Sequence, residues 1–276
     1  MRIFVATLRK LIRRPASWVT LGLLVGLLAL ILVSVGATVR QQPAGNARLT
    51  SLLLLTFPGA YVLILSFILG LGGLLAVIYG ASIAGSEWGW GTLKSAVARG
   101  ESRWRYMALT FAAVALMLGV GLVIAYGASI LATLAAGQLA GVEPTGLDDS
   151  RVLGALPEQL ARSWLAIVEE GAIGFVIATL ARSQLAGIGA GIGIYFGEQF
   201  ATLFLPDIVR YLPFHVAGAA VNLAAAGLGG GGGGAGGAGG GGGGLGPDQA
   251  LLLVVAWLVG AIGLACLFTD RAEISG

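Results

Sequence analysis

The sequence predicts an all-α membrane protein that crosses the bilayer six times, with both ends in the cytoplasm. Of its 276 residues, 57% are hydrophobic and 11% are charged, and the mean hydropathy is +0.92. A soluble chain carries about a quarter charged residues, so the composition indicates lipid surroundings. The second observation is a series of apolar stretches near the ~20 residues that a helix needs to cross ~30 Å of hydrocarbon. We therefore expect a single transmembrane domain over residues 1–276.

Four of the six expected spans contain no charged residue: 16–39, 57–85, 106–138 and 250–268. The first of them is longer than the 7–15 residues of a signal-peptide core, so we interpret it as a retained helix. The other two spans cover residues 159–181 and 184–205, and they contain the acidic residues Glu169, Glu170 and Glu198. These two spans are predicted in spite of their carboxylates.

The basic residues indicate the orientation, because Lys and Arg beside a span favour the cytoplasmic side. With the N-terminus inside, eleven of the 16 Lys and Arg residues fall in cytoplasmic pieces and five in outside pieces. An odd number of spans would place Arg271 outside. Six spans fit this distribution better, and we expect a multi-pass protein of the cell membrane.

The segments at and between the spans also carry predictions. Residues 1–14 alternate apolar and basic side chains at helical spacing, which predicts an interfacial helix resting on anionic headgroups before Pro15 starts the first span. Residues 227–246 are glycine-rich, and we expect a disordered external loop. The chain lacks a GxxxxGK[ST] pattern, so we expect no cofactor in it. The lone His215 is interpreted as a loop residue and the lone Cys266 as a packing residue, and no metal site is expected.

The longest charged loop expected inside covers residues 86–105 and reads SEWGWGTLKSAVARGESRWR. Gly89 and Gly91 allow a turn, TLKSAVAR can form two turns of amphipathic helix, and Gly100 ends it. Flanking Trp and Tyr residues would fix the depth of this helix at the membrane surface. Such a helix could transmit force from a docked partner into two spans. The alternative is a membrane-anchored loop with ordinary interfacial aromatic residues.

This loop resembles the signature of type-2 ABC exporter permeases. The likeness lies in Glu87-Trp88, in Gly91-Thr92-Leu93, in the short helix and in the segment 102–106 that leads into the next span. Similarity extends over most of the chain, with further pieces at residues 180–183, 210–213 and 268–271. The glycine run and the adjacent glutamates depart from the family pattern, which weakens any transfer of a substrate.

The resemblance implies a six-helix permease subunit that performs no chemistry itself. It would pair with a second permease chain, as a homodimer or heterodimer, and with separate cytoplasmic ATPase subunits that hold ATP and Mg²⁺. Residues 1–14 would be the elbow helix, and the loop at 86–105 would hold the coupling helix that contacts the ATPase. The residues that take this coupling role are Glu87, Gly91, Thr92, Leu93, Lys94, Arg99 and Arg103. The expected partners are these subunits and the lipid bilayer, with no nucleic acid.

Glu169 and Glu170 lie near the middle of a span, where an ionised carboxylate costs a few kcal/mol and must face protein or water. Adjacent helical residues point about 100° apart, so at least one should face the bundle interior. With Glu198, they could form a substrate or proton path, or they could clamp helices together. They also leave two other functions open, which are a proton-coupled secondary transporter and an intramembrane enzyme with a paired acid and base.

Five glycines precede Glu198 at odd-numbered positions: Gly187, Gly189, Gly191, Gly193 and Gly197. Glycines repeated at every fourth residue give a smooth helix face that a neighbouring backbone can approach closely. Such a face could lie at the interface of a permease dimer. Alternatively, glycine breaks this helix and Glu198 belongs to a re-entrant or outer-leaflet segment. The substrate remains open between lipid, peptide, drug and polysaccharide.

Overall fold

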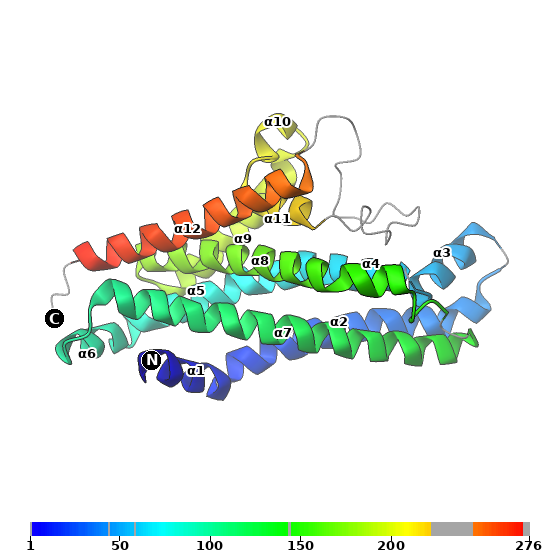
Figure 1. Cartoon of the computed structure of the whole chain (residues 1–276), viewed down its shortest axis with the longest axis horizontal. Coiled ribbons are helices and arrows are strands. Elements are labelled where there is room, and N and C mark those ends of the chain that lie inside the picture. The colour runs from blue at the N-terminus through cyan, green and yellow to red at the C-terminus, as the bar shows by residue number, and fades with distance from the viewer. Residues whose placement is uncertain (1, 44, 58, 143–144, 222–244, 273–276) are drawn as a thin grey trace.

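The computed structural model describes residues 2–43, 45–57, 59–142, 145–221 and 245–272, and these ranges contain helices and no strands. The longest helices run along a common axis (Figure 1). The predicted all-α class is therefore confirmed for the described part of the chain. All but the last two residues of the glycine-rich stretch 227–246 lie outside the described residues.

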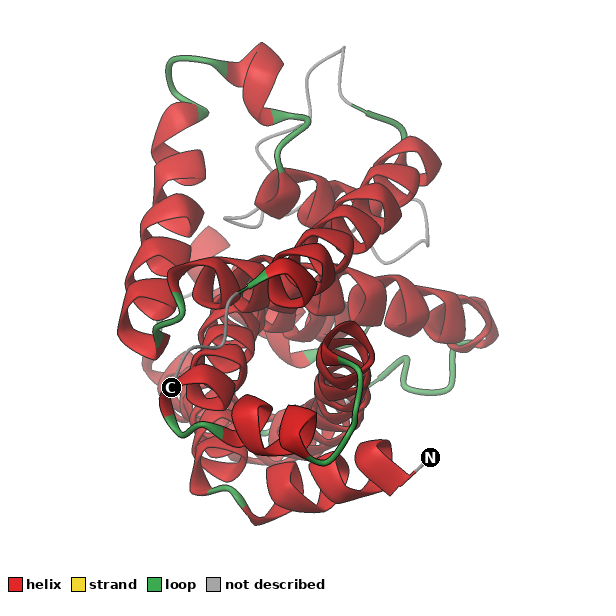
Figure 2. Cartoon of the chain, turned by 90° about the vertical axis from the view of Figure 1, so that its left-hand side faces the viewer, coloured by secondary structure: helices red, strands yellow, loops and turns green. Residues whose placement is uncertain are grey.

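The chain begins with a short helix across one end of the bundle. This helix, α1 (Arg2–Arg13), coincides with the helix predicted at 1–14, and α2 (Pro15–Thr38) follows directly. Pro15 occupies the first position of α2, where its missing N–H costs no helical hydrogen bond. Figure 2 shows α1 lying across the bundle end, and its Leu11 is fully buried in a cluster with Met107 and Phe111.

The other helices follow in chain order: η1 (Val39–Gln41), α3 (Asn46–Leu55), α4 (Gly59–Phe67), η2 (Ile68–Gly72), α5 (Gly73–Gly89), α6 (Thr92–Ala98), α7 (Arg103–Ala140), α8 (Ser150–Ala181), α9 (Gln184–Ala201), α10 (Pro206–Val209), α11 (Pro213–Ala220) and α12 (Pro247–Arg271). α4, η2 and α5 succeed one another without a break, and η2 is a π-helical turn within this rod. Such turns occur often at functional sites.

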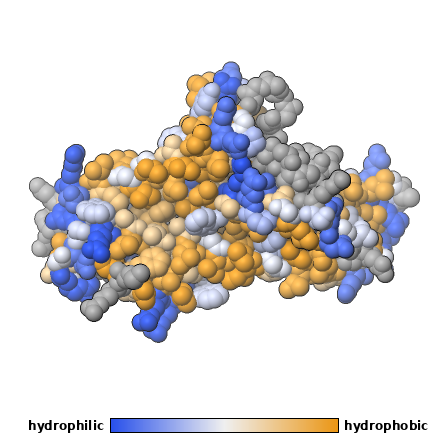
Figure 3. Space-filling model, in the orientation of Figure 1, coloured by the Kyte–Doolittle hydropathy of each residue, from blue (hydrophilic) through white to orange (hydrophobic). Residues whose placement is uncertain are grey.

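Among the described residues, five helical segments are long and apolar enough to cross a membrane: Pro15–Gln41, Gly59–Gly89, Arg103–Ala140, Leu153–Ala181 and Pro247–Arg271. Hydrophobic side chains cover much of the middle of the face in Figure 3, and hydrophilic ones gather at both ends and in a strip at its upper middle. α9 forms the helix expected at 184–205, but its glycines and Glu198 leave it outside this set. The six-span count and the cytoplasmic position of the termini stay predictions.

α8 is the central helix of the bundle. Of its most apolar segment 72% is buried, against 17–50% for the other four long segments, and it packs against α5, α7, α9, α11 and α12. Glycines bring α5 and α8 close together, because a Cβ on Gly80 would overlap the Gly171 carbonyl and a Cβ on Gly174 would overlap the Val77 carbonyl. Side chains at residues 166–179 of α8 therefore face protein on nearly all sides.

Candidate functional site

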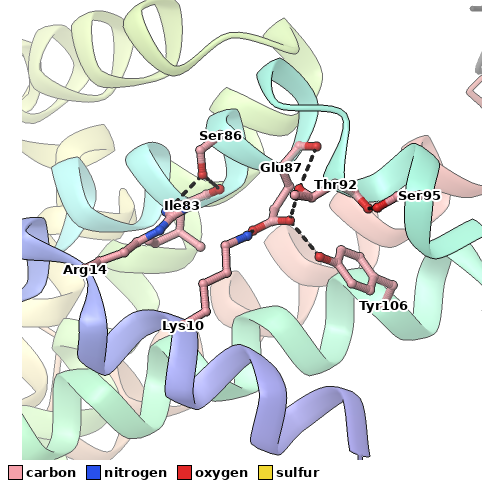
Figure 4. Close-up of polar contacts among 8 residues, drawn as sticks. All are labelled: Lys10, Arg14, Ile83, Ser86, Glu87, Thr92, Ser95 and Tyr106. Atoms are coloured by element: carbon pink, nitrogen blue, oxygen red, sulfur yellow. Dashed lines mark hydrogen bonds and ion pairs between the residues drawn. The ribbon is translucent and has the colours of Figure 1, made fainter.

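One buried carboxylate connects four helices at the bundle end that carries α1 and α6 (Figure 4). Glu87 lies in the last turn of α5 and is 1% exposed. Lys10 of α1 donates to its Oε1 at 2.6 Å, Tyr106 of α7 donates to its Oε2 at 2.7 Å, and the hydroxyl of Thr92, the first residue of α6, also donates to Oε2. We call this group the Glu87 network.

α6 has a buried face and an exposed face. Leu93 and Ala96 are 1% and 2% exposed, while Lys94 and Arg99 point outward from the bundle. Gly91 is the N-cap residue directly before α6, and its φ of 66° lies in the left-handed region that glycine adopts without strain. The helix predicted within residues 86–105 is confirmed, and its exposed cationic residues lie on a rigidly attached surface.

The seven residues expected to couple to an ATPase thus fall into different positions. Glu87, Thr92 and Leu93 point into the bundle end and hold α6 in place. Arg103 starts α7 and donates through Nη1 to the Ala272 carbonyl at 2.6 Å, which ties α7 to the end of α12. Lys94 and Arg99 are the two cationic side chains on the exposed face of α6.

Two arginines that the sequence did not single out join the same end. The guanidinium of Arg182, in the turn between α8 and α9, lies 5.2 Å from the Trp88 ring centre and 5.4 Å from that of Phe268. Arg14 lies 4.7 Å from the Trp90 ring centre and donates to Ser86 Oγ at 3.0 Å. Cation–π contacts of this kind contribute ~0.5–2 kcal/mol. These aromatic residues therefore hold neighbouring helices together, in addition to the expected role of fixing the depth of the loop at the membrane surface.

Glu169 and Glu170 lie deep in the bundle, at 0% and 3% exposure. Within the described residues, both oxygens of Glu169 and Oε2 of Glu170 have no hydrogen-bond partner. The Glu170 carboxylate lies against the backbone of Gly73, directly after the π-helical turn η2. Tyr195 of α9 donates to the Gly70 carbonyl of the same turn at 2.8 Å. Both glutamates face protein, as the sequence required of at least one.

Glu198 has a defined structural partner. It is 5% exposed in the last turn of α9, and its Oε2 accepts the backbone N–H groups of Phe214 at 3.1 Å and His215 at 3.3 Å. These N–H groups belong to the first turn of α11, whose positive dipole end favours a carboxylate. His215 lies in α11 and not in a loop, and burial lowers the pKa of its imidazole, which disfavours the charged form.

The glycines of α9 divide into two groups. The helix runs unbroken through all five. A Cβ on Gly187 would overlap Ala178 of α8 and one on Gly191 would overlap the Val77 side chain of α5, whereas a Cβ on Gly189, Gly193 or Gly197 would meet nothing within 4 Å. The first group packs inside the chain and the second faces outward.

In the described part of the chain, no three His, Cys, Asp or Glu side chains are placed to hold a metal ion. Comparison of the sequence with protein-family models and with curated proteins found no match.

Proposed function

We propose that this chain is the membrane-spanning permease subunit of an ABC exporter, in which a separate cytoplasmic ATPase drives the helices through α6. The observation that carries the proposal is the Glu87 network, which joins α6 through one buried carboxylate to α1, α5 and α7. A partner that pushes on α6 would move three further helices together, because a buried, hydrogen-bonded charge resists separation.

The topology of this permease has six spans, formed by α2, the α4–α5 rod, α7, α8, α9 and α12. Both the start of α1 and the end of α12 lie at the same end of the bundle as α6 (Figure 1), and the excess of basic residues assigns this end to the cytoplasm. α9 is the shortest span, because 18 helical residues extend about 27 Å. Its outward-facing Gly189, Gly193 and Gly197 offer a close-packing face for the second permease chain.

The test targets the exposed face of α6. The chain is co-expressed with the ATPase subunit encoded beside its gene, and the complex is isolated in mild detergent. The double variant Lys94→Glu and Arg99→Glu should lose the ATPase and the stimulation of its ATP turnover, since both side chains lie outside the packed core. Arg48→Glu reverses one charge on the half-buried Arg48 of α3, in another part of the chain, and should keep both. Unchanged complex formation by the double variant would contradict the proposal.

A second candidate function is transport driven by protons through Glu169 and Glu170. The observation that favours it is that three of the four oxygens of these deeply buried carboxylates have no hydrogen-bond partner within the described residues, and intramembrane carboxylates often form proton relays. In vesicles without ATP, a proton gradient would then drive flux that Glu170→Gln abolishes. Flux that requires the ATPase subunit and ATP would exclude this function.

A further inference from the structure

An apolar groove opens between α2, the η2–α5 segment and α7. Its cavity has a volume of about 90 Å³ and is lined mainly by aliphatic side chains, including Leu21, Leu24, Ile68, Leu75 and Leu122. α2 and α7 touch farther along, where a Cβ on Gly36 would overlap the Ala136 backbone. At the groove they stand apart, since a Cβ on Gly121 would first meet Leu21 Cδ1 at 4.0 Å.

The groove reaches the outer surface of the bundle. Three of its lining residues are large and exposed: Trp18 is 56%, Val120 45% and Ile124 43% exposed. They belong to helices long and apolar enough to span a membrane. In a bilayer, this surface faces acyl chains, and an interfacial Trp such as Trp18 lies at headgroup depth. The end of the groove at Trp18 is therefore its headgroup end.

Polar groups gather at that end. Ser17 donates to the Leu11 carbonyl at 2.8 Å, so its oxygen accepts from the Tyr79 hydroxyl at 2.9 Å, and both residues line the groove. Arg14 precedes Ser17 by three residues and lies beside the residues that line the groove. Its Nη1 bonds to Ser86, but its buried Nη2 has no hydrogen-bond partner within the described residues. A buried guanidinium donor of this kind favours an anionic oxygen.

The groove is open to the outer surface and is apolar along its length, so a flexible acyl chain of the bilayer can lie along it. We infer that the groove binds one acyl chain of an anionic phospholipid whose phosphate is held by Arg14. This inference rests on membrane insertion, which is one part of the proposed function, and it is independent of ATPase coupling.

The first test compares two lipids with identical chains, palmitoyl-oleoyl phosphatidylglycerol and phosphatidylcholine, by counting bound lipids on the detergent-purified full chain by native mass spectrometry. The wild type should bind the anionic lipid about tenfold more tightly, in line with one charge-assisted contact. Arg14→Gln should remove this preference. Equal binding of both lipids by the wild type would overturn the inference. Full displacement of phosphatidylglycerol by inorganic phosphate alone would also overturn it, because the acyl chains would then contribute nothing to binding.

The second test fills the groove. Gly121→Leu places a side chain in open space beside Leu21 and should weaken binding of both lipids about tenfold, whereas Gly26→Leu, on α2 outside the groove and with no atom within 4 Å of its Cβ, should not. Unweakened binding to a folded Gly121→Leu variant would overturn the inference.

A spectroscopic readout covers the case in which Gly121→Leu does not fold. Phosphatidylglycerol with a brominated acyl chain should quench wild-type fluorescence more strongly than that of Trp18→Phe, because Trp18 lines the groove. Equal quenching of the two proteins would overturn the inference. Flotation with vesicles is measured in parallel. A protein that floats with the vesicles but shows no lipid preference contradicts only the inference on the groove. A protein that does not float contradicts the membrane assignment on which both proposals rest.

Discussion

Replacing Glu87 by Gln removes one negative charge and keeps the shape of the side chain, so it isolates the role of the Glu87 network. Hydrogen bonds to a charged group contribute ~1.5–3 kcal/mol and neutral ones ~0.5–1.5 kcal/mol. Three donors reach this carboxylate. Gln keeps one acceptor oxygen for Thr92 and Tyr106, whose contacts each lose about 1 kcal/mol, while its NH₂ group cannot accept from Lys10, so that contact is lost. Lys10 is 30% exposed, and water compensates part of its loss. We expect a net loss of about 2–3 kcal/mol, below the 3–5 kcal/mol of a fully buried broken pair.

The loss should be local, and amide hydrogen exchange measures it. Opening of α1 and α6 away from α5 should become roughly 30- to 150-fold more frequent, since 1.4 kcal/mol corresponds to a factor of ten, and their amides should exchange faster accordingly. Glu101→Gln is the matched control, because Glu101 lies in the same loop and makes no ion pair with any described residue. The reasoning is refuted if Glu87→Gln and Glu101→Gln leave exchange in α1 and α6 equally slow.

Three further predictions concern packing and capping, and each is tested by thermal unfolding in detergent. Gly73→Ala should lower the midpoint, because its Cβ would overlap the Glu170 carboxylate and overpacking costs ~1–3 kcal/mol; an unchanged midpoint would contradict the contact. Gly187→Ala should destabilise by a similar mechanism, whereas Gly189→Ala, with open space at its Cβ, should stabilise by about 0.5–1 kcal/mol through helix propensity. Equal effects of these two variants would contradict the division of the α9 glycines. Glu198→Ala should cost ~0.5–2 kcal/mol by removing the cap of α11, while Glu198→Gln keeps an acceptor and should cost less; the reverse order would contradict the capping role.

The sequence predicts the long helices well because their signal is local. Length and apolar composition locate the five long spans, and Gly91 and Gly100 bracket α6 as expected. The short helices α3, α10 and α11 were not predicted, since elements of 4–10 residues depend on tertiary packing more than on propensity. The π-helical turn η2 was not predicted either, because its apolar residues fit an ordinary α-helix equally well.

The Glu87 network was predictable in kind but not in detail. Glu87 is the first acidic residue of the chain, and seven basic residues precede it. A buried carboxylate is costly unless a cation or hydrogen-bond donors compensate its charge, and the preceding basic residues are candidates for this role. Lys10 is 77 positions away, and its selection depends on how α1 packs across the bundle end. Charge order therefore predicts a basic partner, and only the fold identifies it.

The two helices that contain Glu169, Glu170 and Glu198, which are α8 and α9, have different surroundings. α8 is the most enclosed of the five long segments, so Glu169 and Glu170 are shielded from lipid by neighbouring helices. α9 exposes one face, and its Glu198 lies in the last turn, where the backbone of α11 satisfies it. A carboxylate in an apolar segment thus predicts either a helix surrounded by protein or a position at a helix end. In both cases, the acid that lowers the apolar character of a span is evidence for its neighbours, because lipid could supply no hydrogen bond to it.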